Sequence, residues 1–256
     1  MRLAFAISLI WAAATIGLEG PDLMFIGNQY MPENKSFSFT YPPIGATRIE
    51  ATAQHGFVYG IKSLNWNYVS GRCDWKDYSA NIAFRSYGID KLYLSSWYSI
   101  SARKLFFHKF VLGLGYGRNE TNYGDNLFKT SEDYMAIDAG FNLGNLAIAA
   151  LAGNISLNKN NEISDKPEYL AACSWQADSS LSVNCLLYND KRNHKRLIVN
   201  QNLAVHKSLN IIAGIISAPE IYYAGLEIVY KRFVFGYTFY AVGGLDDCSK
   251  LAISYR

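Results

Sequence analysis

In the segment GLEIVYKRFVFGYTFYAV, from Gly225 to Val242, large apolar side chains alternate with small or polar ones, with a period of two residues. Strand side chains point to opposite faces in turn, so a hairpin about Lys231 and Arg232 sorts this segment into two faces. On the large face the expected opposite pairs are Tyr230 with Phe233, Ile228 with Phe235, Leu226 with Tyr237 and Ala224 with Phe239. The other face is small and mixed, with the acid Glu227 opposite Gly236. Either a protein core or lipid must cover the large face.

The same alternation continues through most of the chain, and helical periodicity is nearly absent. The composition favours strands, because aromatic residues make up 15% of the chain, with 19 Tyr and 14 Phe. We predict an all-β fold of about fourteen strands, each roughly 7–14 residues long, close to what a tilted membrane-spanning strand requires. The predicted strands are 35–41, 56–69, 76–87, 91–102, 108–118, 132–142, 145–156, 167–177, 181–189, 195–206, 209–217, 220–230, 233–242 and 249–256.

The lengths of the predicted connections distinguish a barrel from a sandwich, which would show the same alternation. Short connections are expected around Arg72, Lys104–Phe107, Gly144, Asp178–Ser180, Lys207–Ser208 and Lys231–Arg232. The connections between them include the long ones, Pro42–His55, Asn119–Ser131, Leu157–Lys166, Asn189–His194 and Gly243–Cys248. Short turns at one end and long loops at the other are typical of outer-membrane barrels. The pattern therefore predicts an antiparallel up-and-down transmembrane β-barrel in the bacterial outer membrane.

The first residues resemble a secretory signal peptide. Arg2 precedes an apolar run from Leu3 to about Ala13, and Ala12 and Ala14 suit a cleavage site between small residues. A membrane anchor or buried helix is the alternative, but the run is shorter than the ~20 residues of a spanning helix. We predict a signal peptide at 1–14, a periplasmic lead or short plug at 15–33 and the barrel at 34–256.

The four cysteines Cys73, Cys173, Cys185 and Cys248 have neither the CxxC nor the Cys/His spacing of a zinc site, so no metal is expected. Cys173 and Cys185 lie opposite each other if Asp178–Ser180 is a three-residue hairpin loop. A disulfide between them is possible in an oxidising compartment. Two free, small apolar side chains on one strand face are the other interpretation.

No catalytic residue or cofactor is predicted. The histidines His55, His108, His194 and His206 fall in expected loops or at strand ends. His206 and Ser208 flank a turn, a spacing that does not indicate a nucleophile with its base. The GLGYG segment at Gly113–Gly117 sits in a strand with no helix after it, which excludes a dinucleotide fingerprint. Its glycines are expected to leave room for barrel curvature or a neighbouring side chain. A net charge of +3 without a basic block argues against nucleic acid as a partner.

Polar residues on the small face of the predicted strands are candidates to line a lumen. They are Lys62, Asn65, Asn67, Asn81, Arg85, Arg103, Asn184, Asn200, Asn202, Glu227, Lys250 and Ser254. The alternative is that these side chains pair with one another and fill a closed interior.

The C-terminal region resembles the end of FadL-like outer-membrane barrels, in particular the PorV-type families. The matching residues are Tyr223, Ala224, Gly225, Tyr230, Lys231, Phe233, Tyr237, Leu245, Ser254, Tyr255 and Arg256, and SFSFTYPPIG from Ser36 and GFVYGIKSLNWNYVSG from Gly56 look like the first strands of that family. The resemblance is a pattern without a catalytic signature. It implies a barrel in outer-membrane lipid that passes apolar small molecules. A scaffold or anchor that binds a secretion-machinery or envelope protein, and a soluble secreted β-protein, are the alternatives.

Overall fold

A computed structural model describes most of the chain from Thr47 onward. The described residues are 47–58, 61–89, 92–107, 109–124, 128–157, 168–189, 195–217, 220–242 and 248–255. They form the strands β1 (Thr47–Val58), β2 (Ile61–Trp75), β3 (Tyr78–Ile89), β4 (Tyr93–Phe106), β5 (Phe110–Tyr123), β6 (Phe128–Asn142), β7 (Leu146–Ser156), β8 (Glu168–Gln176), β9 (Leu181–Asn189), β10 (Lys195–His206), β11 (Leu209–Ile216), β12 (Ile221–Tyr230), β13 (Phe233–Val242) and β14 (Cys248–Tyr255). The predicted signal peptide and lead lie outside this part of the chain.

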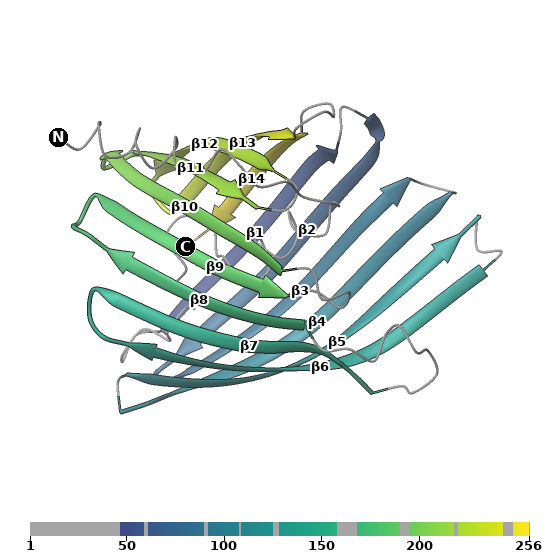
Figure 1. The fold of residues 1–256 in the computed structure, drawn as a ribbon, viewed down its shortest axis with the longest axis horizontal. Coiled ribbons are helices and arrows are strands. Elements are labelled where there is room, and N and C mark those ends of the chain that lie inside the picture. The colour runs from purple at the N-terminus through teal and green to yellow at the C-terminus, as the bar shows by residue number, and fades with distance from the viewer. Residues whose placement is uncertain are drawn as a thin grey trace.

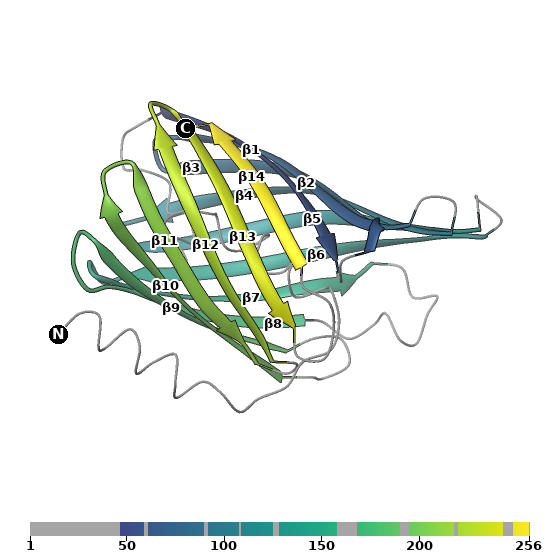
Figure 2. The same cartoon turned by 90° about the horizontal axis from the view of Figure 1, so that it is seen from above.

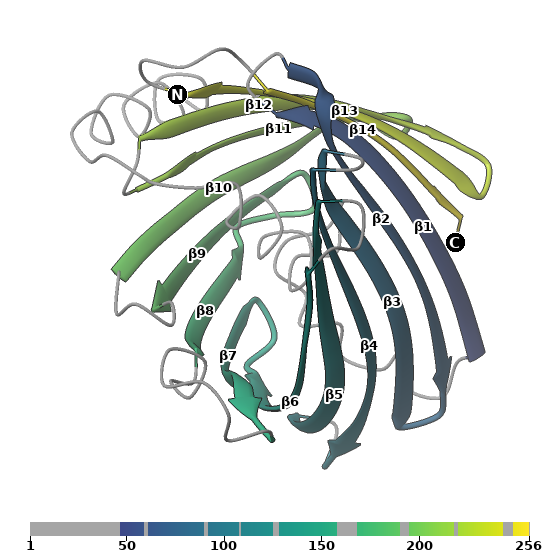
Figure 3. The same ribbon diagram turned by 90° about the vertical axis from the view of Figure 1, so that its right-hand side faces the viewer.

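The fourteen strands close into one barrel in which each strand pairs with its neighbours in the sequence (Figures 1 and 3). Every pair is antiparallel, and β1 closes the sheet against β14, with Ala51 opposite Tyr255 and Phe57 opposite Ser249. The prediction of an up-and-down antiparallel barrel is confirmed. Among the described residues, no helix is long and apolar enough to cross a membrane.

The outward face of the barrel is largely apolar. On β13, Phe233, Phe235 and Tyr237 are exposed, and the residues opposite them on β12 and β14, such as Leu226 and Leu251, are exposed as well. Exposed large apolar side chains recur on β3 to β9. A monomer in water rarely exposes a continuous apolar surface of this extent, whereas lipid covers it without cost.

The register of the C-terminal hairpin is the predicted one. Tyr230 lies opposite Phe233, Ile228 opposite Phe235, Leu226 opposite Tyr237 and Ala224 opposite Phe239. Glu227 lies opposite Gly236 on the other face and is only 3% exposed. Strands β12, β13 and β14 run side by side along one wall (Figure 2).

The first two strands differ from the prediction. Predicted strand 35–41 lies outside the described residues, and the predicted loop Pro42–His55 is mostly strand β1. Predicted strand 56–69 spans the end of β1 and the start of β2, which are separated only by residues 59 and 60. The outward residues Ala51 and Ala53 are small, so β1 lacks the large apolar face by which the other strands were recognised.

The predicted long loop Asn119–Ser131 is also mostly strand. β5 continues to Tyr123 and β6 begins at Phe128, so the connection is only residues 124–127. Figure 2 shows the long strands of this part of the barrel reaching beyond the others. Their outward positions become charged after Tyr116, where Arg118 contacts Glu120 at 3.0 Å. A strand beyond the apolar band is polar on both faces, and sequence patterning therefore mistook it for a loop.

The asymmetry in connection length is weaker than predicted. The connections at one end are short: residues 76–77, 107–109, 143–145, 177–180, 207–208 and 231–232. The first of them was predicted around Arg72, which instead lies within β2, so that turn comes later in the chain than predicted. The opposite end is hereafter called the loop end. Its longest connection is 157–167, but the connection between β1 and β2 consists of only two residues, 59 and 60. The strand pairing that closes the barrel, and not loop length, is what establishes the fold.

Candidate solute-binding site in the barrel lumen

The inward face of the barrel carries an ion pair that spans three strands. Arg103 of β4 and Asp138 of β6 both lie opposite Gly113 of β5, which separates them. The Nε atom of Arg103 donates to Asp138 Oδ2 at 2.6 Å and to Oδ1 at 3.2 Å. Because Gly113 has no side chain, the two charged groups meet over its backbone.

The glycines of β5 form a stripe that neighbouring side chains partly cover. A Cβ atom on Gly113 would lie 1.8 Å from Asp138 Oδ1, and one on Gly117 would lie 2.4 Å from Tyr134 Cζ. A Cβ on Gly115, between them, would meet its nearest atoms at 3.5 Å or more. The expectation that these glycines leave room for a neighbouring side chain is confirmed at Gly113 and Gly117.

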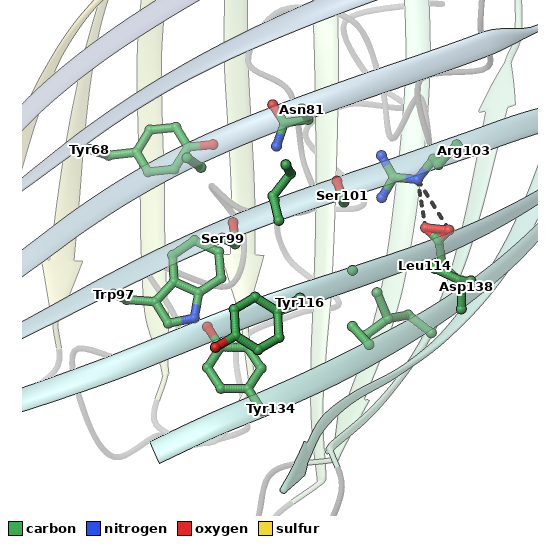
Figure 4. A pocket seen from close by; sticks show the side chains of 15 residues that line it. Tyr68, Asn81, Trp97, Ser99, Ser101, Arg103, Leu114, Tyr116, Tyr134 and Asp138 are labelled. Carbon is green, nitrogen blue, oxygen red and sulfur yellow. Dashed lines mark hydrogen bonds and ion pairs between the residues drawn. The ribbon is translucent and has the colours of Figure 1, made fainter. Parts of the chain in front are cut away.

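A cavity of about 70 Å³ opens beside the stripe (Figure 4). Its polar lining includes Asn81, Ser99, Ser101, Arg103 and Asp138. Its aromatic lining on the inward face consists of Tyr68, Trp97 and Tyr134, and the rings of Trp97 and Tyr134 stack with centroids 6.1 Å apart. A guanidinium, an amide and hydroxyls beside stacked rings can hold the polar head of a small solute while its apolar part lies on the rings.

A second charged cluster lies farther along the same wall, at the ends of β2 and β3. Arg72 Nε donates to Asp74 Oδ1 at 2.7 Å and to Ser79 Oγ at 3.1 Å, and Glu50 lies 3.8 Å from Arg72 Nη1. The carboxylates of Asp74 and Glu50 offset the charge of this guanidinium. The cluster is therefore a charge-balanced ion-pair network next to the cavity, although Asp74 Oδ2 is buried without a hydrogen-bond partner among the described residues.

On the opposite wall a side chain again lies over an inward glycine, but the groups involved are uncharged. Asn184 Nδ2 donates to Asn200 Oδ1 at 2.6 Å across β9 and β10. Tyr223 of β12 lies over Gly214 of β11, where a Cβ would come within 2.4 Å of its ring, and its hydroxyl hydrogen-bonds Asn200. Tyr223 also contacts Tyr240, with ring centroids 5.5 Å apart.

Near the loop end, the wall formed by β8 to β14 is largely apolar. Those of β8 to β14 that lie close to this end and are buried in one cluster are Leu170, Leu186, Tyr188, Ile198, Ile216, Ile221, Tyr240 and Cys248. Arg196 and Lys250 are buried charged residues in the same region. Toward the short turns the buried lumen residues are mostly polar, including Asp74, Ser79 and Glu227. On the wall formed by β8 to β14, the buried lumen residues therefore change from largely apolar near the loop end to more polar toward the short turns.

Most of the predicted lumen candidates lie on the inward face. Arg103 and Asn81 line the cavity, Arg85 lies 5.4 Å from the Trp97 ring centroid, and Glu227 accepts a hydrogen bond of 3.1 Å from Asn210. The inward face of the other wall holds Asn184, Asn200, Asn202, Lys250 and Ser254.

Asn67 differs from the prediction. It alternates with buried Tyr68 and lies beside exposed Val69, so it belongs to the outward face, where its Oδ1 is 2.8 Å from His55 Nδ1. The side chains of Lys62 and Asn65 lie outside the described part of the structure.

Sequence reasoning missed Asp138, Trp97 and Tyr134. Asp138 occurs in the mostly apolar run MAIDAGF of β6. A single acid in such a run indicates an inward position, and Asp138 could have been predicted to face the lumen for this reason.

Cys173 and Cys185 lie directly opposite each other on β8 and β9, as the hairpin prediction required, and both thiols are free. Their exposed neighbours Ile148 and Leu187 show that this pair is on the outward face. No group of three or more His, Cys, Asp or Glu that could hold a metal ion occurs within the described ranges.

Comparison with known proteins supports the architecture. No protein-family model matches the chain, and no curated protein matches it in sequence. The outer membrane protein Omp33 of Acinetobacter baumannii has a similar structure, with a TM-score of 0.58 and 11% identity over 82% of this chain and 98% of that one. A mutant of the Rh. blastica porin has a TM-score of 0.50 and 8% identity over 82% of this chain and 99% of that one.

At such identities the similarity shows a shared fold, that of outer-membrane β-barrels. A closer relationship to FadL-like or PorV-type barrels stays a prediction.

Proposed function

We propose that this protein is an outer-membrane channel that passes small solutes. The observation that carries the proposal is the segregation of the two faces of one closed sheet. Exposed residues such as Leu226 and Phe235 cover the outside, whereas Glu227 and the Arg103–Asp138 pair lie inside. This distribution suits a barrel with lipid around it and a polar path within it. The similarity of the fold to a porin and to an outer membrane protein supports the same function.

We further propose that the solutes have an apolar part. Support comes from the buried cluster near the loop end, which includes Leu186 and Ile198, and from the aromatic residues Trp97 and Tyr134 farther inside. Leu186 and Ile198 are almost completely buried, so an apolar molecule that enters at the loop end would contact them only after these side chains separate, and would then meet groups of its own polarity before the ion pairs. A general aqueous pore does not require an apolar entrance.

Two measurements test this function in sequence. The first is fractionation of expressing cells followed by electrophoresis with and without boiling, in which an outer-membrane barrel gives a heat-modifiable band. The second is solute flux into proteoliposomes that contain the purified full chain, compared between a small aromatic compound and a sugar of similar mass. Recovery in the soluble fraction without a mobility shift would reject the membrane barrel. A heat-modifiable barrel without flux of either solute would reject the channel.

The alternative of a membrane-embedded scaffold has one observation in its favour. Lumen residues from several strands, including Leu186, Ile198 and Asn184, are almost completely buried. A filled interior is what a scaffold requires, since it needs no path for solutes. In that case proteoliposomes would show no flux, and affinity purification would recover a stoichiometric envelope protein.

A further inference from the structure

We infer that the cavity beside the glycine stripe binds the carboxylate of a small amphipathic acid, with the Nη edge of Arg103 as its anchor. This inference rests on the proposed channel function and specifies the class of solute. The cavity is lined by groups from β2 to β7 and holds polar atoms that the fold itself does not use.

Arg103 is oriented for such a ligand. Its Nε atom is bound to Asp138, and within the described part of the chain its two Nη atoms form no hydrogen bond or ion pair. In Figure 4 these two nitrogens point toward the side of Asn81 and Ser101. The Arg103 side chain is 18% exposed, so the free edge is accessible from the lumen. Two parallel N–H donors of a guanidinium match the two oxygens of a carboxylate.

Further polar groups converge on the same space. Asn81, Ser99 and Ser101 line the cavity, and among the described residues their side chains have no hydrogen-bond partner. These three side chains are half-buried, so their polar atoms are accessible from the cavity and are available, beside the free guanidinium edge, to water or to a ligand. An amide and two hydroxyls can each bond a carboxylate or its bridging water.

Three guanidinium groups lie along the wall that holds the cavity. Asp138 faces Arg103, and its two oxygens already accept from Nε. Arg85 lies with its guanidinium 5.4 Å from the Trp97 ring centroid. Arg72 is the next cation along the wall, but Asp74 and Glu50 offset its charge.

The size of the cavity sets the form of the ligand. A volume of about 70 Å³ admits a carboxylate head but not a whole drug-sized molecule. Tyr68, Trp97, Tyr134 and Leu151 form the lining next to the polar groups, and they suit an aromatic or aliphatic tail that extends along the lumen. A compact aromatic acid therefore meets both requirements.

The test is calorimetric titration of the purified full chain in detergent with benzoate, and with benzamide as its uncharged near-isostere. We expect the wild-type protein to prefer benzoate. Arg103→Gln is expected to weaken benzoate binding about tenfold or more, because it removes a charge-assisted hydrogen bond, and to leave benzamide binding unchanged. Arg118→Gln is the matched control, since it removes the same charge from the outward face, where Arg118 contacts Glu120.

Two further variants keep the test decisive if Arg103→Gln fails to give a heat-modifiable barrel. Arg103→Gln combined with Asp138→Asn removes the whole ion pair and leaves no unpaired acid. Ser101→Leu fills the cavity while both charged residues stay in place. Each is expected to lose the preference for benzoate.

The inference is overturned if the wild-type protein binds benzoate no better than benzamide, or if the folded variants bind benzoate as tightly as the wild type. Because binding is measured in detergent, it is separate from solute flux. Flux without benzoate binding would overturn the inference alone, and benzoate binding without flux would overturn the channel function alone.

Discussion

Arg103 and Asp138 are held together by a residue that has no side chain. They lie on strands β4 and β6, with Gly113 of β5 directly between them in register, and their closest approach is 2.6 Å. Gly117 and Tyr134, on the same strands β5 and β6, repeat the arrangement, and so do Gly214 and Tyr223 on the opposite wall. Glycines on the inward face thus determine where large or charged side chains reach across the lumen wall.

Gly113→Ala tests this relationship. A Cβ atom 1.8 Å from Asp138 Oδ1 would displace the carboxylate from Arg103 and leave buried polar groups unsatisfied. We expect the free energy of unfolding in lipid vesicles to fall by about 1–3 kcal/mol. Gly115→Ala is the matched control, because its Cβ would lie at least 3.5 Å from any neighbour. Equal stability of the two variants in denaturant titrations would contradict the arrangement.

Gly214→Ala is expected to be costly for a different reason. Its Cβ would lie 2.4 Å from the Tyr223 ring and 2.7 Å from the carbonyl oxygen of Val199, which belongs to the backbone and cannot rotate away. Overpacking of this kind typically costs about 1–3 kcal/mol. Gly236→Ala, where the nearest atom is 3.5 Å away, should change stability much less. Thermal loss of the heat-modifiable band would compare the two, and an undisturbed Gly214→Ala barrel would argue against close packing there.

Leu226→Lys examines the lipid-facing surface. Leu226 is the sixth of the ten residues of β12 and is 51% exposed on the outward face. A lysine near the bilayer midplane costs about 2–4 kcal/mol, whereas one near the interface costs about 0–1 kcal/mol. Val205→Lys provides the comparison, since Val205 is 55% exposed but lies next to the end of β10. If both variants unfolded from vesicles at the same denaturant concentration, lipid would not be the medium that covers Leu226.

The pair Cys173 and Cys185 makes a chemical prediction. The two residues are direct partners across β8 and β9, close enough for a disulfide, and both thiols are free. We expect a membrane-soluble oxidant to join them and to protect both from alkylation, which mass spectrometry of peptides would detect. Cys73, exposed on β2, is the internal control and should remain alkylated. Alkylation of Cys173 and Cys185 after oxidation would contradict the register of this hairpin.

Much of the barrel could be predicted because consecutive residues of a strand point to opposite faces. The pairing of Leu226 with Tyr237 and of Glu227 with Gly236 followed from one hairpin turn and a period of two. β1 was missed because its outward alanines give little apolar contrast. The tips of β5 and β6 were missed because both of their faces meet water.

The candidate site could be predicted only in part. Arg103 and Asn81 were recognised as inward polar residues, but nothing local indicates that Arg103 meets Asp138, which is 35 residues away. Their meeting depends on the register of two successive hairpins and on a glycine between them. Trp97 and Tyr134 are likewise brought together across β5.

The sequence by itself determined that the chain forms alternating strands with a large apolar face, because side-chain alternation is a property of each strand alone. Only the tertiary structure decided that β1 closes on β14 and which inward side chains share a cavity. Closure and register join residues that are far apart in the chain. The local pattern fixes the face of a side chain but not its partner across the lumen wall.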